Sequence, residues 1–236
     1  MASIIPTQQL FIVTSALNPR MGVISREDRL QQTIDGLKSL REKCPDAIVM
    51  FAEGSPDKVE QEKIKELSDY VDMVADFSGD KNISQFAKTG RKSEAENVLM
   101  LKMMMLLKQE PSLMKLRHSV SRIYKLSGRT IINDGFDIHD HNRFGKYIFK
   151  KRMPTWLQGE RAEIFTDLLI TRLFSFCPSL IDDYMIVCQR NIGVIVDTGV
   201  DTEHAHFFNI NPDYLIELDN IHCQGTMAST GATEIY

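Results

Sequence analysis

The first half of the chain alternates short apolar runs with helical patterns, and this alternation constrains the fold more than any other feature. Three runs are rich in apolar and β-branched residues, which is typical of buried strands, at residues 10–16, 47–52 and 71–76. Two helical patterns lie between them: Ser25 is an N-cap for residues 25–43, and Pro56 begins residues 56–69. Strands that alternate with helices predict an α/β fold with a mostly parallel sheet flanked by helices.

The remaining residues continue this mixed pattern without a linker. Residues 77–92 are polar and predict a surface loop, whereas residues 93–109 predict a buried helix whose four methionines fill the core. Further on, we expect strands at residues 146–149, 164–170 and 215–221 and helices at residues 178–190 and 202–208. Since no low-complexity segment divides the 236 residues, the sequence predicts a single domain.

Composition and charge argue against several classes of function. With 43% hydrophobic and 25% charged residues the chain has an ordinary globular balance, and its formal charge of -4 offers no basic surface to nucleic acid. No apolar run approaches the roughly 18 residues that cross a bilayer, and the N-terminus lacks a signal-peptide pattern. The four cysteines are far apart, so we expect reduced thiols and a cytoplasmic protein, with neither a zinc site nor disulfides.

The most informative stretch is a central strand that runs into the polar turn Ser127-Gly128-Arg129. A glycine inside a strand indicates a bulge or a close ligand, and the cations Lys125 and Arg129 suit an anionic ligand such as a diphosphate. Ligands of parallel sheets bind beyond the carboxyl ends of the strands, so this turn should share a crevice with the ends of the first three strands. The alternative is an ordinary core strand followed by a polar hairpin.

Several standard motifs are missing from the sequence. Neither Gly-x-Gly-x-x-Gly after the first strand nor Gly-x-x-x-x-Gly-Lys-Ser/Thr occurs, which argues against ordinary dinucleotide-binding dehydrogenases and P-loop nucleotidases. The segment Leu126-Ser127-Gly128 lacks the first glycine of Gly-x-Ser-x-Gly, which argues against a serine hydrolase.

Three groups of polar residues each have two interpretations. Glu203 beside His204 can act as a general base, or the pair can be a helix cap with a hydrogen-bonded histidine. Arg172 lies inside an apolar run and should pair with either a structural acid or a ligand phosphate. His139 and His141 have metal-ligand chemistry, although histidines one residue apart on a loop are more often exposed to solvent.

With these residues assembled, the sequence resembles the GT-A glycosyltransferases. It is most similar to the small enzymes of bacterial and viral polysaccharide synthesis that have Ser-Gly-Arg instead of Asp-x-Asp. The resemblance covers most of the chain, and its motifs are residues 12–15, 90–94, 125–129, 171–176 and 202–204, followed by Gly225 and Gly231. The order and spacing of these motifs carry the resemblance.

The resemblance implies a GT-A-like, Rossmann-like fold in which residues 1–137 bind a nucleotide-sugar donor and residues 138–236 bind a glycan acceptor. Thr14, Ala16 and Glu53 would line the nucleoside pocket. The other donor-binding residues would be Lys92, Lys125, Ser127, Gly128 and Arg172, together with the catalytic Arg129. Glu203 would be the base that deprotonates an acceptor hydroxyl, and His204 would orient it or bind the acceptor.

The turn Ser127-Gly128-Arg129 departs from the family pattern, because most members have Asp-x-Asp there to bind Mn²⁺ or Mg²⁺. A metal offsets the charge that builds on the leaving diphosphate, and the fixed donors of an arginine can do the same. We favour metal-independent transfer with Arg129 and a lysine as electrophiles. The alternative keeps Mn²⁺ or Mg²⁺ bound by Asp134 and Asp137 in the turn that follows.

Two other functions stay open on the sequence alone. A non-catalytic domain that binds a sugar or a nucleotide would keep the fold without turnover. A nucleotidyltransferase would share the sheet and the phosphate chemistry, but it would use a nucleoside triphosphate and require Mg²⁺. No motif specifies the sugar, the nucleotide base, the acceptor, the stereochemistry or the oligomeric state.

Overall fold

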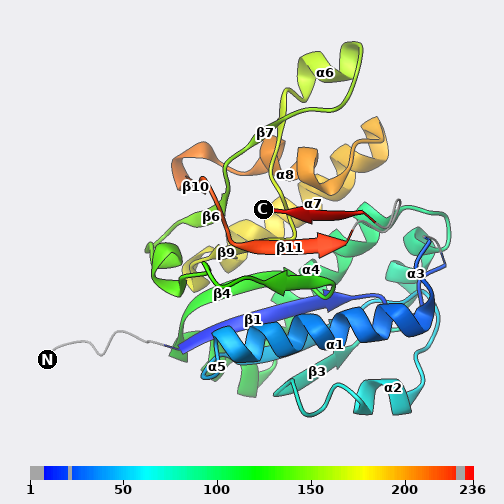
Figure 1. Cartoon of the computed structure of the whole chain (residues 1–236). Coiled ribbons are helices and arrows are strands. Elements are labelled where there is room, and N and C mark those ends of the chain that lie inside the picture. Colours follow the sequence, from blue (N-terminus) through cyan, green and yellow to red (C-terminus); the bar gives the residue numbers. More distant parts are fainter. Residues whose placement is uncertain (1–7, 21–22, 227–231) are drawn as a thin grey trace, which may run out of the picture.

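The computed structural model describes residues 8–20, 23–226 and 232–236. Its centre is a seven-stranded sheet with the strand order β10-β6-β9-β4-β1-β2-β3 (Figure 1). These strands are β1 (Gln8–Ser15), β2 (Ile48–Glu53), β3 (Met73–Asp76), β4 (Val120–Ser127), β6 (Tyr147–Lys150), β9 (Leu173–Phe176) and β10 (Leu215–Leu218). Neighbouring strands run parallel except around β9, which is antiparallel to both β4 and β6.

Helices cover both faces of this sheet. The α-helices of the described residues are α1 (Arg26–Lys43), α2 (Gln61–Lys65), α3 (Lys81–Ala87), α4 (Lys92–Gln109), α5 (Pro111–Ser119), α6 (Glu160–Ile164), α7 (Ile181–Thr198) and α8 (Thr202–Asn209). Three short 3₁₀ helices are η1 (Ile138–His141), η2 (Pro178–Leu180) and η3 (Pro212–Tyr214). In Figure 1, α1 lies in front of the sheet, and α4 and α7 lie behind it.

The sequence of β1 explains why the sheet needs helices on both faces. Successive side chains of a strand point to opposite faces, and in β1 the residues of both sets are apolar. Phe11 and Val13 pack with residues of α1, whereas Leu10 and Ile12 pack with residues of α4 and α7. All four side chains are at most 1% exposed, so the core has two layers separated by the sheet.

Two smaller elements complete the described fold. A three-stranded sheet joins β5 (Thr130–Ile132) to β11 (Cys223–Thr226) and β12 (Thr233–Ile235), and it brings β11 beside the turn that follows β4. The chain from β7 (Met153–Pro154) through α6 to β8 (Asp167–Leu168) forms an arm that projects from the body in Figure 1. We call residues 153–168 the arm.

The structure confirms the α/β class, the mostly parallel sheet and its first three strands. Ser25 caps α1 as predicted, because its Oγ accepts a hydrogen bond from the backbone N–H of Asp28. The helix predicted at 93–109 is α4, and three of its four methionines are buried in the core, the exception being Met105. No helix among the described residues is long and apolar enough to cross a membrane. Gly231 lies outside the described residues.

Three predicted elements are wrong. The helix predicted at 56–69 is only the short α2, because residues 56–59 form a loop whose Pro56 carbonyl and Val59 N–H bond to Ser84 and Ser78. The surface loop predicted at 77–92 contains α3, which Asp80 caps with its side chain. The strand predicted at 164–170 is mostly absent: its apolar residues are buried apart from Ile164, but only Asp167 and Leu168 pair as β8.

Two further differences concern the second half. Strand β9 was not predicted, because its four residues follow Arg172 inside one apolar run that has no turn signal. The helix predicted at 178–190 continues as α7 to Thr198, where Gly199 ends it in the left-handed conformation with φ of 71°.

Candidate functional site

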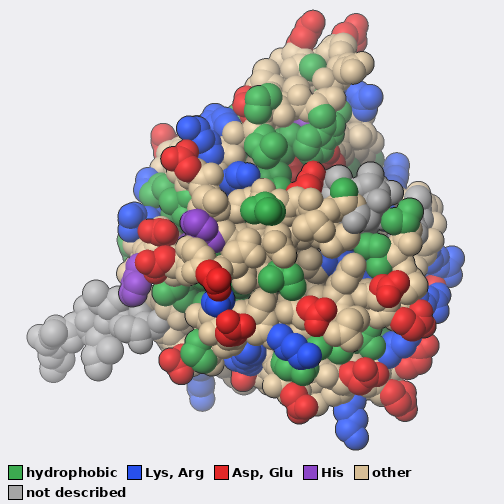
Figure 2. Space-filling model, in the orientation of Figure 1, with side chains coloured by type: hydrophobic (Ala, Val, Ile, Leu, Met, Phe, Trp, Pro, Cys, Tyr) green, Lys and Arg blue, Asp and Glu red, His purple; other side chains and the backbone are tan. Residues whose placement is uncertain are grey.

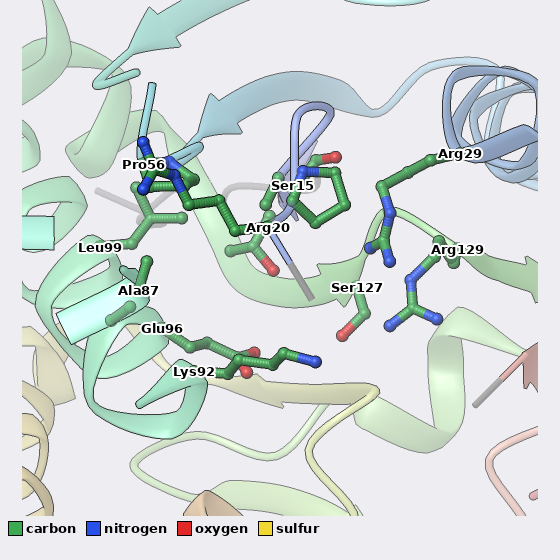
Figure 3. A pocket seen from close by; sticks show the side chains of 16 residues that line it. Ser15, Arg20, Arg29, Pro56, Ala87, Lys92, Glu96, Leu99, Ser127 and Arg129 are labelled. Atoms are coloured by element: carbon green, nitrogen blue, oxygen red, sulfur yellow. The ribbon is translucent and has the colours of Figure 1, made fainter. Parts of the chain in front are cut away.

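A pocket of about 180 Å³ opens at the carboxyl ends of β1 and β4, where parallel sheets bind their ligands. One wall is formed by the residues that end β1, and a second by the turn after β4 (Figure 3). α4 contributes a third wall. Of the residues predicted to form the donor site, those that line the pocket are Thr14, Ala16, Lys92, Ser127, Gly128 and Arg129.

Three cations converge on this pocket beside Arg20, which also lines it but pairs with Asp57 at 2.9 Å. Figure 3 shows the guanidinium groups of Arg29 and Arg129 pointing into it side by side, while the Lys92 side chain extends toward Ser127. Arg29 is only 6% exposed, and its Nε has no hydrogen-bond partner among the described residues. No described residue forms an ion pair with any of the three cations.

Burial and mutual repulsion act on these cations together. The pKa of Arg129 is lowered to about 10, first by burial and then by the charges of Arg29 and Arg172. The pKa of Lys92 is also lowered, first by burial and then by the charges of Arg29 and Arg129. Like charges gathered in a partly buried pocket are unfavourable unless an anion compensates them, so this arrangement is complementary to a multiply charged anion.

The shape of the turn depends on glycines at two places. The N–H of Gly128 donates to the carbonyl of Thr14 at 2.8 Å, and a Cβ on Gly128 would lie 3.2 Å from that oxygen. From the other side, Gly36 of α1 packs on the turn so closely that a Cβ there would lie 2.9 Å from the carbonyl oxygen of Thr130. The close approach predicted at Gly128 is therefore made by β1 and α1, and it holds α1 against the turn.

Lys125 lies beneath the pocket and is 1% exposed. Its ammonium donates to Ser127 Oγ at 2.8 Å and to the carbonyl of Thr171 at 2.7 Å, and it forms an ion pair with Glu96. An ammonium has three N–H donors, so all are already in use. Lys125 therefore positions Ser127 and Glu96, in contrast to the expectation that it faces a diphosphate.

Glu96 is the one carboxylate among the described residues that line the pocket. Its side chain is 32% exposed, so one part faces the pocket while the other contacts Lys125. Burial raises the pKa of Glu96, but the ammonium of Lys125 outweighs this and holds it below its ordinary value. Glu96 is thus an ionised carboxylate in an otherwise cationic pocket.

Glu203 lies at the start of α8, close to Glu96. Its Oε1 accepts a hydrogen bond from Thr171 Oγ1 at 2.8 Å, and the side chain is half-buried. The pKa of Glu203 is raised to about 7, first by burial and then by the nearby carboxylates of Asp201 and Glu96. A carboxylate with a pKa near neutrality can accept a proton and release it again, as a general base must.

The side chain of His204 has different contacts from that of Glu203, its neighbour in the sequence. It is fully buried, and its Nδ1 lies 2.7 Å from Asp201 Oδ1 while its Nε2 lies 2.7 Å from Thr155 Oγ1. Because Nδ1 faces a carboxylate, it carries the proton, and Nε2 accepts a hydrogen bond from the Thr155 hydroxyl. His204 thus ties the arm to α8, and it does not line the pocket.

Glu53 supports the pocket from below. It is fully buried, and its carboxylate accepts backbone N–H groups of Leu17 and Ser55. Burial raises the pKa of Glu53 to about 7, although these hydrogen bonds partly oppose the increase. It organises the loops after β1 and β2 rather than lining the pocket as expected.

Arg172 is also outside the pocket lining. Its Nε donates to the hydroxyl of Tyr236 at 3.1 Å, and its guanidinium lies over the same ring, 5.8 Å from the centroid. Gly225 packs against it so tightly that a Cβ would approach its Cδ to 2.9 Å. Arg172 therefore anchors the sheet of β11 and β12 beside Arg129, whose Nη1 donates to the carbonyl of Thr226.

Comparison with solved structures identifies the architecture around this pocket. Core-mannan synthase A from Aspergillus fumigatus, in its Mn/GDP form, matches with a TM-score of 0.50 at 10% identity, covering 98% of this chain and 79% of that chain. The fold is GT-A-like.

Two other glycosyltransferase structures match with lower scores. The enzyme involved in the glycosylation of the major capsid of PBCV-1 has a TM-score of 0.47 at 12% identity, covering 91% of this chain and 82% of that chain. The PaToxG glycosyltransferase has a TM-score of 0.45 at 10% identity, covering 89% of this chain and 67% of that chain. No protein-family model and no curated protein matches the chain.

The residues of this GT-A-like pocket do not fit a divalent cation. Ser127-Gly128-Arg129 offers a hydroxyl and a guanidinium at the end of β4, and Glu96, the carboxylate of the lining, is paired with Lys125. Hard cations such as Mn²⁺ and Mg²⁺ require oxygen ligands with compensating negative charge, and the surrounding cations oppose this.

The structure separates Asp134 and Asp137 from the pocket, against the alternative that they bind its metal. Asp134 pairs with Lys43 at 2.7 Å, at the opposite end of α1 from Arg29, which is ~20 Å away at 1.5 Å per residue. Asp137 accepts the backbone N–H of His139 as the cap of η1. The described residues contain no group of three or more histidine, cysteine or acidic side chains suited to a metal.

Sequence reasoning missed Arg29 and Glu96. Both are charged residues on helix faces that are otherwise largely buried: Arg29 shares its face with Thr33 and Leu40, and Glu96 shares its face with Met100 and Met103. A charged residue on the buried face of a predicted helix was the signal that could have identified them.

Proposed function

We propose that this chain is a glycosyltransferase that moves a sugar from a nucleotide-sugar donor to a hydroxyl of a glycan acceptor. The observation that carries the proposal is the convergence of Arg29, Lys92 and Arg129, without ion-pair partners among the described residues, on a pocket at the strand ends of a GT-A-like sheet. A diphosphate supplies the negative charge that these cations lack.

The pocket accommodates the other parts of such a donor. Pro19, Pro56 and Leu99 give its lining apolar parts suited to a nucleoside. Figure 3 shows Pro56 and Leu99 across the pocket from Arg29 and Arg129. Glu96 would accept hydrogen bonds from sugar hydroxyls, since a carboxylate in a cationic pocket fits a ligand with both anionic and hydroxyl-bearing parts. A plain phosphate ion would leave Glu96 unused.

The transfer step follows from this arrangement. Glu203 removes the proton from the acceptor hydroxyl as the new bond to the anomeric carbon forms and the bond to the diphosphate breaks. The charge that develops on the leaving diphosphate is offset by Arg29, Lys92 and Arg129, which already line the pocket without a ligand. The steps assigned to these side chains require no metal ion.

A thermal-shift screen tests the donor site. Sugar conjugates of UDP, GDP, CMP and dTDP are added to the protein with EDTA or with Mn²⁺, because a ligand that binds only the native state raises its melting temperature. We expect one nucleotide class to raise the melting temperature in EDTA and Arg129→Gln to abolish the shift. Arg26→Gln, an exposed arginine on α1, is the control that should retain it.

The remaining outcomes of the thermal-shift screen point to other mechanisms or functions. A shift that requires Mn²⁺ contradicts the metal-independent mechanism but keeps the donor site. A parallel sample with nucleoside triphosphates and Mg²⁺ tests the other enzyme class, and a shift in that sample alone would indicate a nucleotidyltransferase. Binding without turnover of the donor, even with acceptor present, would indicate a non-catalytic domain, and no shift at all would refute the donor site.

A further inference from the structure

The arm is fixed to the body by a chain of hydrogen bonds at its base. The hydroxyl of Thr155 donates to His204 Nε2 at 2.7 Å and accepts the backbone N–H of Leu157 at 3.1 Å. The backbone N–H of Thr155 donates across the arm to the carbonyl of Thr166 at 2.9 Å. His204 is in turn held by Asp201, so the base of the arm has a defined position relative to α8.

Trp156 follows this anchored threonine directly, yet its side chain is 58% exposed. Its ring meets the ring of His204 edge-on, with 5.0 Å between centroids, so the histidine supports one side of the indole while the rest faces solvent. Phe208, 53% exposed, belongs to the same cluster, with its ring 5.3 Å from that of Phe165. Figure 2 shows hydrophobic side chains gathered in this upper part of the molecule.

A continuous series of contacts joins Trp156 to the candidate pocket. Glu203 precedes His204 on the first turn of α8, and its carboxylate is held by Thr171. The carbonyl of Thr171 accepts from Lys125, which holds Ser127 in the wall of the pocket. The indole is thus an exposed aromatic surface that packs on His204, the residue that directly follows the proposed base Glu203 in α8.

We propose that Trp156 is a stacking platform for a pyranose ring of a neutral oligosaccharide acceptor. A pyranose has an apolar C–H face, which packs on a flat aromatic ring, while its hydroxyls remain free at the edge. An indole that already packs against the His204 ring loses less conformational entropy on binding than one without a contact. The inference deepens the proposed function and rests on it, because it takes the acceptor to be a glycan.

Other occupants fit the arm less well. Between Thr155 and Thr166 the arm carries Glu160 and Glu163 against the single cation Arg161, and this acidic balance opposes an anionic membrane surface. It also opposes an acceptor with several negative charges. A second copy of this chain is the remaining occupant, and the experiments below distinguish it.

Trp156 is the only tryptophan in the chain, so its intrinsic fluorescence reports this position alone. The protein is titrated with mannotetraose, cellotetraose, maltotetraose and xylotetraose, each without nucleotide and with the donor nucleotide found by thermal shift. We expect at least one tetrasaccharide to change the emission saturably, with a weaker effect from its monosaccharide. If none of the four changes the emission under either condition, the platform is refuted.

The second measurement uses transfer to the tetrasaccharide that changes the emission. Trp156→Ala should lower kcat/KM for that acceptor at least tenfold, mainly through KM, and Trp156→Phe should recover part of the loss. Phe144→Ala removes an 89% exposed aromatic ring on the segment between β5 and β6 and should change neither constant. Equal losses in the two alanine variants would overturn the assignment.

These results separate the platform from the donor site. If Trp156→Ala retains the nucleotide-induced thermal shift but acceptor KM is unchanged, the platform fails and the donor site stands. If no nucleotide raises the melting temperature, the proposed function fails first. Analytical ultracentrifugation of the wild type and of Trp156→Ala completes the test. If the wild type is a dimer and the variant a monomer, the indole belongs to an interface between two copies of the chain instead.

Discussion

The guanidinium groups of Arg29 and Arg129 face the same pocket, although one belongs to α1 and the other to the turn after β4. Both are lowered in pKa by burial, and neither has an ion-pair partner among the described residues. Such a pair is unfavourable for the folded chain alone and favourable for an anion that joins it. Stability and binding should therefore respond in opposite directions when one of these cations is removed.

Arg29→Met tests this opposition. The variant removes a buried charge while keeping an apolar side chain of similar length, so we expect the melting temperature without ligand to rise. Affinity for the donor nucleotide should fall about tenfold or more, equivalent to ~1.4 kcal/mol, measured by calorimetric titration. Arg26→Met, on the exposed face of the same helix, should change neither quantity. A destabilised Arg29→Met with normal affinity would contradict a binding role.

Glu203→Gln tests the assignment of the base. We expect kcat to fall by about 10²-fold or more, because the amide cannot accept the acceptor proton, while donor affinity stays unchanged. The pKa of Glu203 is about 7, so its carboxyl ionises as pH rises through that value. The rate of the wild type should therefore rise over the same pH range. The variant should lose this step in the pH–rate profile. A profile that keeps the step would assign it to another group.

The same carboxyl has a consequence for stability. Its pKa is raised, chiefly by burial, from its ordinary value of 4.5 to about 7, so the folded state binds the proton more tightly than the unfolded state. The contribution to the free energy of unfolding is present below about pH 4.5 and is lost as pH rises through about 7. The free energy of unfolding, measured by chemical denaturation, should therefore decrease less between pH 5 and pH 8 for Glu203→Gln than for the wild type.

Substitutions at two glycines in helices, Gly36 and Gly193, test how tightly α1 packs on the turn after β4. A Cβ at Gly36 would lie 2.9 Å from the carbonyl oxygen of Thr130, so Gly36→Ala should destabilise the protein by about 1–3 kcal/mol. A Cβ at Gly193 in α7 would meet no atom of the described residues within 4 Å, so Gly193→Ala should stabilise it by about 0.5–1 kcal/mol. Urea unfolding measures both, and changes of the same sign would refute the tight packing of α1 on the turn.

Local patterns were sufficient for the first two strands and for the helix between them. The apolar runs of β1 and β2 and the capped helix after Ser25 are encoded within short windows, so the sequence predicted them. Strand β9 could not be found in this way, since its four residues are recognisable only through their antiparallel neighbours β4 and β6. The short α2 likewise results from contacts of Pro56 and Val59 with residues near α3, which lie far along the chain.

The sequence predicted those residues of the candidate site whose position follows from the order of the strands alone. Ser127 and Arg129 follow a central strand, and the carboxyl ends of parallel strands meet at one edge of the sheet. The role of Lys125 depended on its ion pair with Glu96, which no local pattern reveals. Arg29 reaches the pocket because α1 packs on the turn at Gly36, a tertiary contact that sequence periodicity does not encode.

The cationic pocket also has a kinetic consequence, because the chain as a whole carries a formal charge of -4. Arg29, Lys92 and Arg129 create a local positive field on a chain of net negative charge, and such a field steers small anions to one entrance. The association rate of a nucleotide diphosphate should therefore fall as ionic strength rises and the Debye length shortens from about 30 Å at 0.01 M to about 8 Å at 0.15 M. A neutral oligosaccharide arriving at Trp156 should associate at a rate that salt leaves unchanged, so the two proposed ligands would reach their sites under different physical control.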